Sequence, residues 1–257
     1  MKISIISYAF YGLQQAGQMD LFGYLESTRY RYGLDAADIW NGTLASLDAD
    51  YLKKVKQALD ERELTLACLA VDDAHIWDPD PQVREKHHRN ALAHLKAAEY
   101  LGARAVRIDI GGQGDDMSVE QFDLVVKRYQ EYAQRAHDHG YKVGPETHWG
   151  PALVPENMTR IHEAVASPAY GIMLHIGHWV EGREDEGDRL VAPWVFHTHV
   201  DWRITTTCLE EKMKILQDAG YQGYWGVEHH SGKNEYSEVA IQVAMVRGVL
   251  DQWWQAS

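Results

Sequence analysis

The chain has 257 residues, of which 45% are hydrophobic and 25% are charged, and its formal net charge is −13 at pH 7. Such a chain can bury a substantial core, and its length fits one α/β barrel or two small domains. The negative charge argues against a broad basic face for nucleic acid or an anionic membrane, and no apolar stretch approaches the roughly 18 residues of a membrane span.

Short apolar segments alternate with amphipathic segments along the chain. The apolar segments are typical of buried strands, and they are Lys2–Ser7, Asp35–Ile39, Leu64–Val71, Ala103–Asp109, Lys142–Pro145, Gly171–Leu174, Trp194–Val200 and Gly223–Glu228. The amphipathic segments predict helices over Asp50–Arg62, Pro81–Leu101, Ser118–His139, Glu156–Ala166, Leu209–Ala219 and Glu238–Trp253. After the sixth strand, the acidic segment Glu181–Asp188 predicts a long loop or a shortened helix.

This alternation predicts a single (β/α)8 TIM barrel over residues 1–257, with an open doubly wound sheet as the alternative. The first strand is followed by an aromatic segment, Tyr8–Gly12, and not by the glycine-rich turn of a dinucleotide-binding sheet. Polar residues also follow nearly every strand, whereas a doubly wound sheet concentrates them where the strand order reverses. Both observations favour the barrel.

The sequence suggests a cytoplasmic location. The amino-terminal segment Met1–Ser7 is too short for a signal peptide and reads as a strand. Cys68 and Cys208 lie far apart and neither belongs to a CxxC pair, so we expect reduced thiols.

Four side chains at the ends of successive predicted strands are candidate metal ligands: Glu146, His175, His199 and Glu228. Because the carboxyl ends of parallel strands meet at one face of a barrel, we expect these side chains to converge. Two carboxylates and two imidazoles have the ligand chemistry of a divalent metal site. The alternative is that they only pair with one another in the core.

Alternation along the seventh strand adds to this pattern. His197, His199 and Asp201 occupy alternate positions and therefore share one face of the strand. Three polar groups on one buried face cost free energy unless they bind something. The His-X-His segment therefore supports a metal site by itself, and Glu146 and Glu228 strengthen the prediction.

Other strand-end residues are candidates for substrate binding. These are Arg107, His148, Trp149, Trp179, Asp201 and Arg203. Faces of sugar rings pack well on indole, so the tryptophans beside these polar residues suit a carbohydrate, although such residues can also fill gaps between barrel and helices. The Trp253-Trp254 pair is typical of helix packing or of an oligomer contact, so we also consider a homo-oligomer.

The strand-end motifs resemble those of the sugar phosphate isomerase/epimerase superfamily. The similar segments follow one another over nearly the whole chain and are Pro145–His148, Leu174–His178, His197–Asp201 and Gly226–His229. That superfamily has the xylose isomerase-like TIM barrel and includes ketose 3-epimerases, inosose dehydratases and endonuclease IV. Its enzymes hold one divalent cation with a Glu, an Asp, a His and a second Glu. Glu146, His199 and Glu228 match three of these, and His175 stands where the Asp is usual.

The resemblance implies a metal-dependent sugar isomerase or epimerase that abstracts a proton next to the carbonyl of a keto-sugar. Glu146 and Glu228 would move the proton, and His178 would polarise a substrate oxygen. Histidine at position 175 would favour Mn, Co, Fe, Ni or Zn over Mg, and we expect Mn. A lyase that eliminates from an inosose or a 3-keto-glycoside is the alternative. An abasic-site endonuclease, which needs a basic groove, and a metal-free binding barrel are less favoured.

Overall fold

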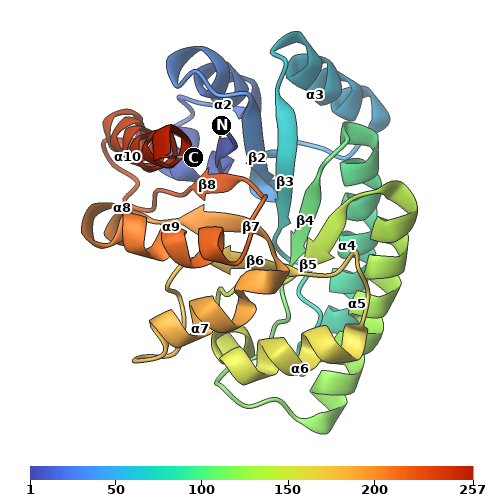
Figure 1. Cartoon of the computed structure of the whole chain (residues 1–257). Coiled ribbons are helices and arrows are strands. Elements are labelled where there is room, and N and C mark those ends of the chain that lie inside the picture. The colour runs from blue at the N-terminus through green and yellow to red at the C-terminus, as the bar shows by residue number, and fades with distance from the viewer. Residues whose placement is uncertain (257) are drawn as a thin grey trace.

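The computed structural model describes residues 1–256, in which eight strands alternate with helices (Figure 1). The strands are β1 (Ile3–Ile5), β2 (Ala36–Trp40), β3 (Thr65–Val71), β4 (Ala105–Ile108), β5 (Lys142–Gly144), β6 (Ile172–His175), β7 (Val195–Val200) and β8 (Trp225–Val227). Each predicted strand is therefore present, with its ends moved by a few residues. The predicted TIM barrel is confirmed.

Within the described residues the strands form two parallel four-stranded ladders, ordered β1-β8-β7-β6 and β2-β3-β4-β5. Isolated bridges link the two ladders at both seams. Ile6 pairs with Asp38 between β1 and β2, and Glu146 pairs with Met173 between β5 and β6. The eight strands therefore surround one interior, and their carboxyl ends lie on one face.

The described helices are α1 (Tyr11–Gln15), α2 (Leu21–Glu26), α3 (Ala49–Glu61), α4 (Pro81–Leu101), α5 (Val119–His139), α6 (Pro155–Val165), α7 (Glu184–Val191), α8 (Trp202–Thr207), α9 (Leu209–Asp218) and α10 (Glu235–Ala256). Every predicted helix is present, and α7 is the shortened helix expected after the sixth strand. The sequence did not predict α1, α2 and α8, because helices of five or six residues are too short to show a helical period.

The two long helices α4 and α5 have well-defined ends. Asp80 accepts a hydrogen bond from the Gln82 amide at 2.8 Å and thereby caps the start of α4, which Pro81 begins. Gly102 ends α4 and Gly140 ends α5, each in the left-handed conformation that glycine adopts at least cost, with φ of 78° and 75°. These ends turn the chain back into β4 and β5.

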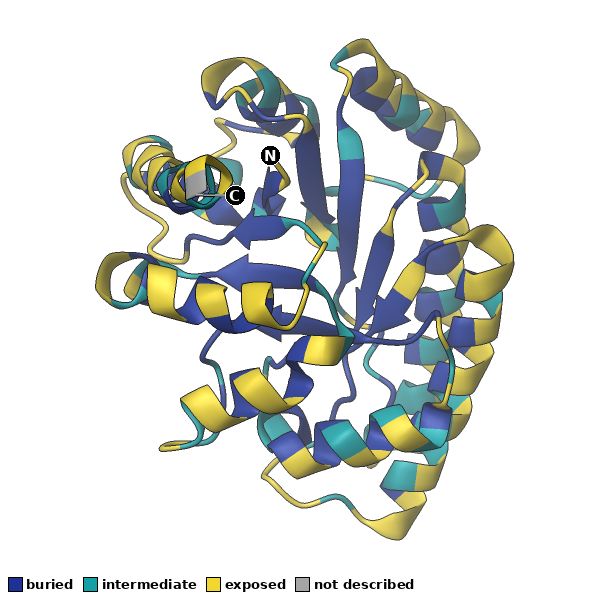
Figure 2. Cartoon of the chain, viewed as in Figure 1, coloured by how far each residue is buried: buried dark blue, intermediate teal, exposed yellow. Residues whose placement is uncertain are grey.

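Side chains alternate between the two sides of each strand. Outward residues such as Ile5, Val106 and Leu174 belong to the large apolar layer between strands and helices. Figure 2 shows the strands buried while the helices expose their outer faces. Inside the barrel, Cys68 and Met173 form part of a small apolar cluster. The other inward positions near the carboxyl ends are polar, and packing alone does not require polar side chains there.

The last helix, α10, carries the tryptophan pair of the carboxyl terminus. Trp253 lies against Trp225, with ring centroids 6.5 Å apart, and the side chain of Trp254 is 78% exposed. An oligomer contact at this end stays a prediction. In residues 1–256, no helix combines the length and the apolar character that a bilayer crossing requires.

Candidate metal and substrate site

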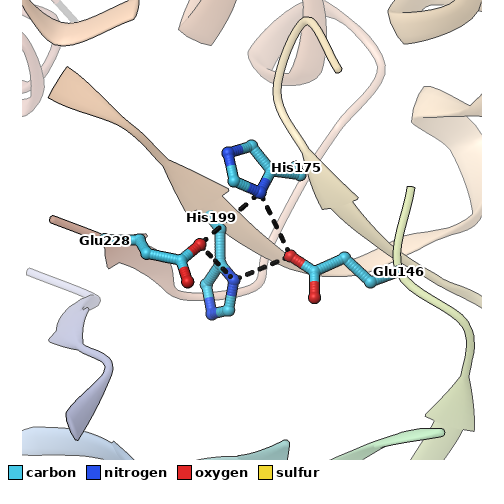
Figure 3. A group of neighbouring side chains, drawn as sticks. All are labelled: Glu146, His175, His199 and Glu228. Atoms are coloured by element: carbon cyan, nitrogen blue, oxygen red, sulfur yellow. Dashed lines mark hydrogen bonds and ion pairs between the residues drawn. The ribbon is translucent and has the colours of Figure 1, made fainter. Parts of the chain in front are cut away.

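The structure brings together the four predicted metal ligands. Glu146 follows β5, His175 ends β6, His199 lies in β7 and Glu228 follows β8. Each side chain is buried and points into the carboxyl-terminal mouth of the barrel. Figure 3 shows the two carboxylates facing each other from opposite sides of the two imidazoles. Strand alternation produces this convergence, because His175 and His199 occupy inward positions of their strands, and Glu146 and Glu228 continue the same alternation just beyond theirs.

The distances between these side chains match those of neighbouring metal ligands. Glu146 Oε1 lies 2.8 Å from His199 Nδ1 and 3.3 Å from His175 Nδ1. Glu228 Oε2 lies 3.0 Å and 3.5 Å from the same two nitrogens. Metal–ligand bonds of about 2.0–2.2 Å at angles between square and tetrahedral place neighbouring ligand atoms about 2.8–3.6 Å apart. The side chains are therefore spaced for one cation.

Glu146, His175, His199 and Glu228 are called the cluster, and their charges balance without a cation. Burial alone would raise the pKa of Glu146 and of Glu228, but the charge of His199 holds both values well below the ordinary range. Burial alone would lower the pKa of the two histidines, yet nearby carboxylates raise it to about 9 for His175 and about 10 for His199. Two imidazolium charges thus offset two carboxylates, and a divalent cation would supply the same two charges.

One atom of the cluster lacks a suitable donor. Glu228 Oε2 is buried and accepts no hydrogen bond from residues 1–256, although His199 Nδ1 lies 3.0 Å away. A buried carboxylate oxygen without a donor costs free energy, and a cation would satisfy it. The residues present therefore fit a divalent metal ion.

The environment of His175 suits a ligand. Its Nδ1 faces the cluster, while its Nε2 lies 3.9 Å from Asp201 Oδ2. The other oxygen of Asp201 accepts a hydrogen bond from the Ile204 amide at 2.7 Å and caps α8, so the carboxylate is held in place. Metal-bound histidines usually turn their second nitrogen toward a carboxylate or carbonyl. Asp201 can fill that role for His175.

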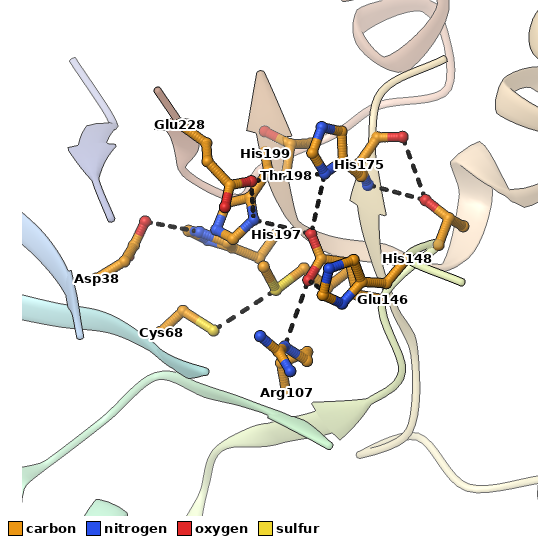
Figure 4. Close-up of polar contacts among 12 residues, drawn as sticks. Asp38, Cys68, Arg107, Glu146, His148, His175, His197, Thr198, His199 and Glu228 are labelled. Carbon is orange, nitrogen blue, oxygen red and sulfur yellow. Dashed lines mark hydrogen bonds and ion pairs between the residues drawn. The ribbon is translucent and has the colours of Figure 1, made fainter. Parts of the chain in front are cut away.

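A buried pair beneath His199 was not assigned a role from the sequence. Figure 4 shows His197 turned toward Asp38 across the barrel interior. His197 Nε2 lies 2.9 Å from Asp38 Oδ2, which also accepts a hydrogen bond from the Ser4 hydroxyl at 2.6 Å. The rings of His197 and His199 meet edge to face, with centroids 5.8 Å apart. Among residues 1–256, His197 Nδ1 and His199 Nε2 are both buried without a hydrogen-bond partner.

We expect the Asp38→Asn variant to bind the metal up to about tenfold more weakly, the lower end of the range for partners bonded directly to a ligand, because Asp38 holds His197, whose ring only packs against the proposed ligand His199. Asparagine keeps the volume of the side chain but removes the charge that fixes the proton on His197 Nε2. Calorimetric titration of the metal-free protein measures the effect, with the exposed Asp50→Asn as the control. An affinity within twofold of the wild type would contradict the prediction.

Arg107, a predicted substrate-binding residue, is engaged by three carboxylates. Its guanidinium donates to Asp72 at 2.8 Å and to Asp109 at 2.9 Å, and its Nε lies 3.3 Å from Glu146 Oε2. Only 5% of the side chain is exposed. Burial alone would lower the pKa of Arg107, but Asp109 and the other carboxylates raise it. Arg107 thus adds a buried positive charge beside Glu146, and its contact with substrate stays a prediction.

Two further predicted residues, His148 and His178, lie beside the cluster. His148 Nδ1 is 3.2 Å from Asp109 Oδ2 and 3.9 Å from Glu146 Oε2. The His178 ring lies 4.9 Å from that of His175, and its Nδ1 is buried without a partner among the described residues. Burial, together with the charge of His175, lowers the pKa of His178. A neutral imidazole therefore stands at the edge of the site.

The remaining predicted residues differ in exposure. Trp149 is 36% exposed and stacks on His148 at an interplanar angle of 6°. Trp179 is buried, and its indole donates to Asp188 at 2.8 Å. Arg203 is exposed and donates to the Gly177 carbonyl at 3.3 Å. Any contact of these residues with substrate stays a prediction, and of the two tryptophans Trp149 is the more exposed.

The structure adds an aromatic wall on the other side of the cluster. His230 Nε2 lies 3.1 Å from Glu228 Oε1, and the His230 ring is 5.8 Å from that of Tyr8. Tyr8 also stacks on Tyr11 and meets the edge of Trp40. Part of this wall comes from the aromatic segment Tyr8–Gly12, which the sequence places after the first strand. The sequence does not show in which direction an aromatic ring points at such a position.

Comparison with known proteins gives a family and a set of similar folds. The model of a family described as xylose isomerase-like TIM barrel matches residues 30–247. The structure is similar to 3-keto-D-glucoside 4-epimerase from E. coli, with 16% identity, a TM-score of 0.78 and coverage of 96% of this chain and 99% of that chain.

Two other solved structures have similar folds. L-ribulose 3-epimerase is 14% identical with a TM-score of 0.77, and the match covers 100% of this chain and 98% of that chain. A probable 3-DHS dehydratase from Bacillus anthracis is 15% identical with a TM-score of 0.74, and coverage is 96% and 99%. No curated protein sequence matches this chain significantly. At these identities the likeness concerns the fold.

Proposed function

This chain belongs to the xylose isomerase-like TIM barrel family, and we propose that it is a metal-dependent sugar isomerase or epimerase acting next to the carbonyl of a keto-sugar. One observation carries the proposal. Two buried carboxylates, Glu146 and Glu228, face each other across two imidazoles at the mouth of the barrel (Figure 3). Sugar epimerases among the solved structures of the same fold support it.

The proposed ligands of one divalent cation are Glu146, His175, His199 and Glu228. When bound, such a cation acts as a Lewis acid that polarises the carbonyl of the substrate. Because the donor set contains two imidazoles, we propose a transition metal, with Mn favoured over Mg.

The two carboxylates differ in ways that suit two roles. Despite burial, His199 holds the pKa of Glu146 well below its ordinary range, and Arg107 lies 3.3 Å away, so the ionised Glu146 can accept the proton from the carbon next to the carbonyl. The C–H electron pair then forms the double bond of an enediolate as negative charge moves to the carbonyl oxygen. Glu228 is also ionised at rest, but it lies 3.1 Å from His230, whose side chain is 49% exposed, so we propose that a proton from solvent reaches Glu228 through His230 before it is passed to carbon.

The fate of the enediolate decides the product. If Glu228 returns a proton to the same carbon from the opposite face, the product is an epimer. If the proton goes to the neighbouring carbon, the product is the aldose–ketose isomer. His178, a neutral imidazole at the edge of the site, would hold a substrate oxygen in place.

A lyase is the second candidate, because a probable dehydratase has a similar fold. Its first step would be the same deprotonation by Glu146. The electron pair would then expel a leaving group from the β carbon and give an enone, with no proton returned to carbon.

Proton NMR in D2O tests the proposal. The metal-loaded protein is incubated with a ketose and, separately, with a 3-keto-glycoside. We expect deuterium to enter the carbon next to the carbonyl while an epimer or isomer accumulates. Appearance of an enone would favour the lyase, and absence of both deuterium exchange and product over a panel of keto-sugars would rule out both candidates.

We also expect the uncharged form of a keto-sugar to be processed with a higher kcat/KM than its phosphate ester. Arg107 is already engaged by Asp72, Asp109 and Glu146, and these carboxylates would repel a phosphate dianion. Matched pairs of substrates, assayed at one pH and salt concentration, measure the preference. A phosphate ester preferred by tenfold, about 1.4 kcal/mol in transition-state binding, would overturn the prediction and indicate Arg203 as a phosphate anchor.

A further inference from the structure

Two adjoining cavities lie beside the four proposed ligands, over the loops that follow β3, β4 and β5, and together they are called the groove. Its inner part has a volume of about 230 Å³ and is lined by residues that include Asp109 and His148, both next to Glu146. Its outer part has a volume of about 740 Å³. His75 and Trp149 line both parts, so the two parts adjoin at these rings.

The groove is larger than the reaction centre needs. Small-molecule sites commonly have volumes of about 300–1,000 Å³. The inner part alone falls below this range, whereas the outer part by itself lies well within it. The groove therefore has room for a portion of substrate beyond the ring that reacts at the cluster.

Indole and imidazole rings form the walls of the groove. Trp149 stacks on His148, and the ring of His75 meets Trp149 edge to face at 5.5 Å. On the outer side, Arg84 lies 4.5 Å from the ring of Trp77 and helps to hold that ring in place. Trp149 is nevertheless 36% exposed, and partly exposed indole rings can pack against the C–H groups of sugar rings.

Bare glycine backbone forms part of the floor. Gly112 and Gly150, from the loops after β4 and β5, both have positive φ. A Cβ at Gly150 would lie 2.8 Å from the Gly112 carbonyl oxygen, so a side chain there is excluded. The loops after β4 and β5 therefore pack closely against each other where they line the groove.

The charge of the groove is negative. Asp72, Asp73, Asp78 and Asp109 line it, and in the described part of the chain neither lining contains a lysine or an arginine. Arg107, behind the lining, pairs with Asp72 and Asp109, which leaves the charges of Asp73 and Asp78 without an arginine or lysine partner within residues 1–256. A phosphate or carboxylate group would therefore be repelled. Neutral hydroxyl groups, in contrast, can donate hydrogen bonds to these carboxylates.

We propose that this groove is the subsite for a second, uncharged sugar ring, so that the substrate is a two-ring keto-glycoside and not a free keto-sugar. The reacting ring lies at the cluster, and the second ring stacks on Trp149 above the glycine floor. The proposal rests on the proposed function of the cluster and deepens it by naming the substrate class.

The test compares a keto-disaccharide with the methyl glycoside of its reacting ring. We expect the wild type to process the disaccharide with at least tenfold higher kcat/KM. Trp149→Ala should lower kcat/KM for the disaccharide about fivefold to tenfold more than for the methyl glycoside, and Trp149→Phe should restore most of the difference, because a ring face remains. Tyr30→Ala removes an exposed aromatic ring away from the groove and serves as the control.

A binding measurement separates this proposal from the proposed function. An unreactive methyl disaccharide is titrated into the metal-loaded protein, and tryptophan fluorescence is followed in the wild type and in Trp149→Phe, with binding confirmed by saturation-transfer NMR. One outcome is that no keto-sugar is turned over, while the disaccharide binds and Trp149→Ala weakens that binding. This outcome would support the sugar subsite and contradict the proposed function. Equal kcat/KM for both substrates, or equal loss in Trp149→Ala, would overturn the subsite.

Discussion

Replacing Glu146 or Glu228 with Gln is expected to lower kcat by about 10²- to 10⁴-fold, equivalent to about 3–5 kcal/mol of transition-state stabilisation. Glutamine has the shape of glutamate but cannot accept a proton in this pH range, so the loss is of charge and of the base. Packing around the site should change little, because both side chains are buried and the amide fills the same volume. The fold should therefore survive either substitution.

The two variants should differ in detail. Glu146→Gln removes one of the three carboxylates around Arg107, while Asp72 and Asp109 still neutralise its charge. Measurements of kcat at saturating metal, of metal content and of thermal unfolding separate loss of the base from loss of the cation or of the fold. Glu163→Gln, an exposed change on α6, is the matched control. Either site variant retaining half of the wild-type kcat would remove that residue from the proton-transfer step.

Substitution of His175 is expected to change which metal the protein holds. His175→Ala removes one of the four proposed ligands. It should therefore weaken metal binding by more than about 100-fold, the upper end of the range for losing a group that only hydrogen-bonds to a ligand. His175→Asp supplies a harder oxygen ligand and one more negative charge. We therefore expect His175→Asp to keep a metal bound and to shift preference from Zn or Mn toward Mg.

Dialysis against mixed metals followed by elemental analysis measures this preference, with the exposed His137→Ala as the control. Unchanged metal content and rate in His175→Ala would show that His175 is not a ligand. A second variant tests the site as a whole. The double substitution Glu228→Ala, His199→Ala should abolish binding, and full metal occupancy in that protein would place the site elsewhere.

The alternation of strand and helix patterns along the sequence was sufficient to predict the barrel and the convergence of the four candidate ligands. Buried strands alternate with helices from Lys2 to Trp253, and parallel strands of a barrel carry their carboxyl ends to one face. Residues at those ends, such as Glu146 and Glu228, must then approach one another whatever the loops do. The short helices α1 and α8 escaped prediction, because one or two turns of helix leave no period to detect.

Only the tertiary structure decided the surroundings of that site. The contact between Asp38 and His197 joins residues 159 positions apart, and the placing of Arg107 among three carboxylates depends on which neighbouring strand presents each group. Local pattern assigns a residue to a strand end and a face, but not the rotamer of its side chain or its partner across the barrel. Trp149 and Trp179 each follow a histidine shortly after a strand, so the sequence does not distinguish them. Trp149 is 36% exposed and Trp179 is buried, because their neighbours in the folded chain differ.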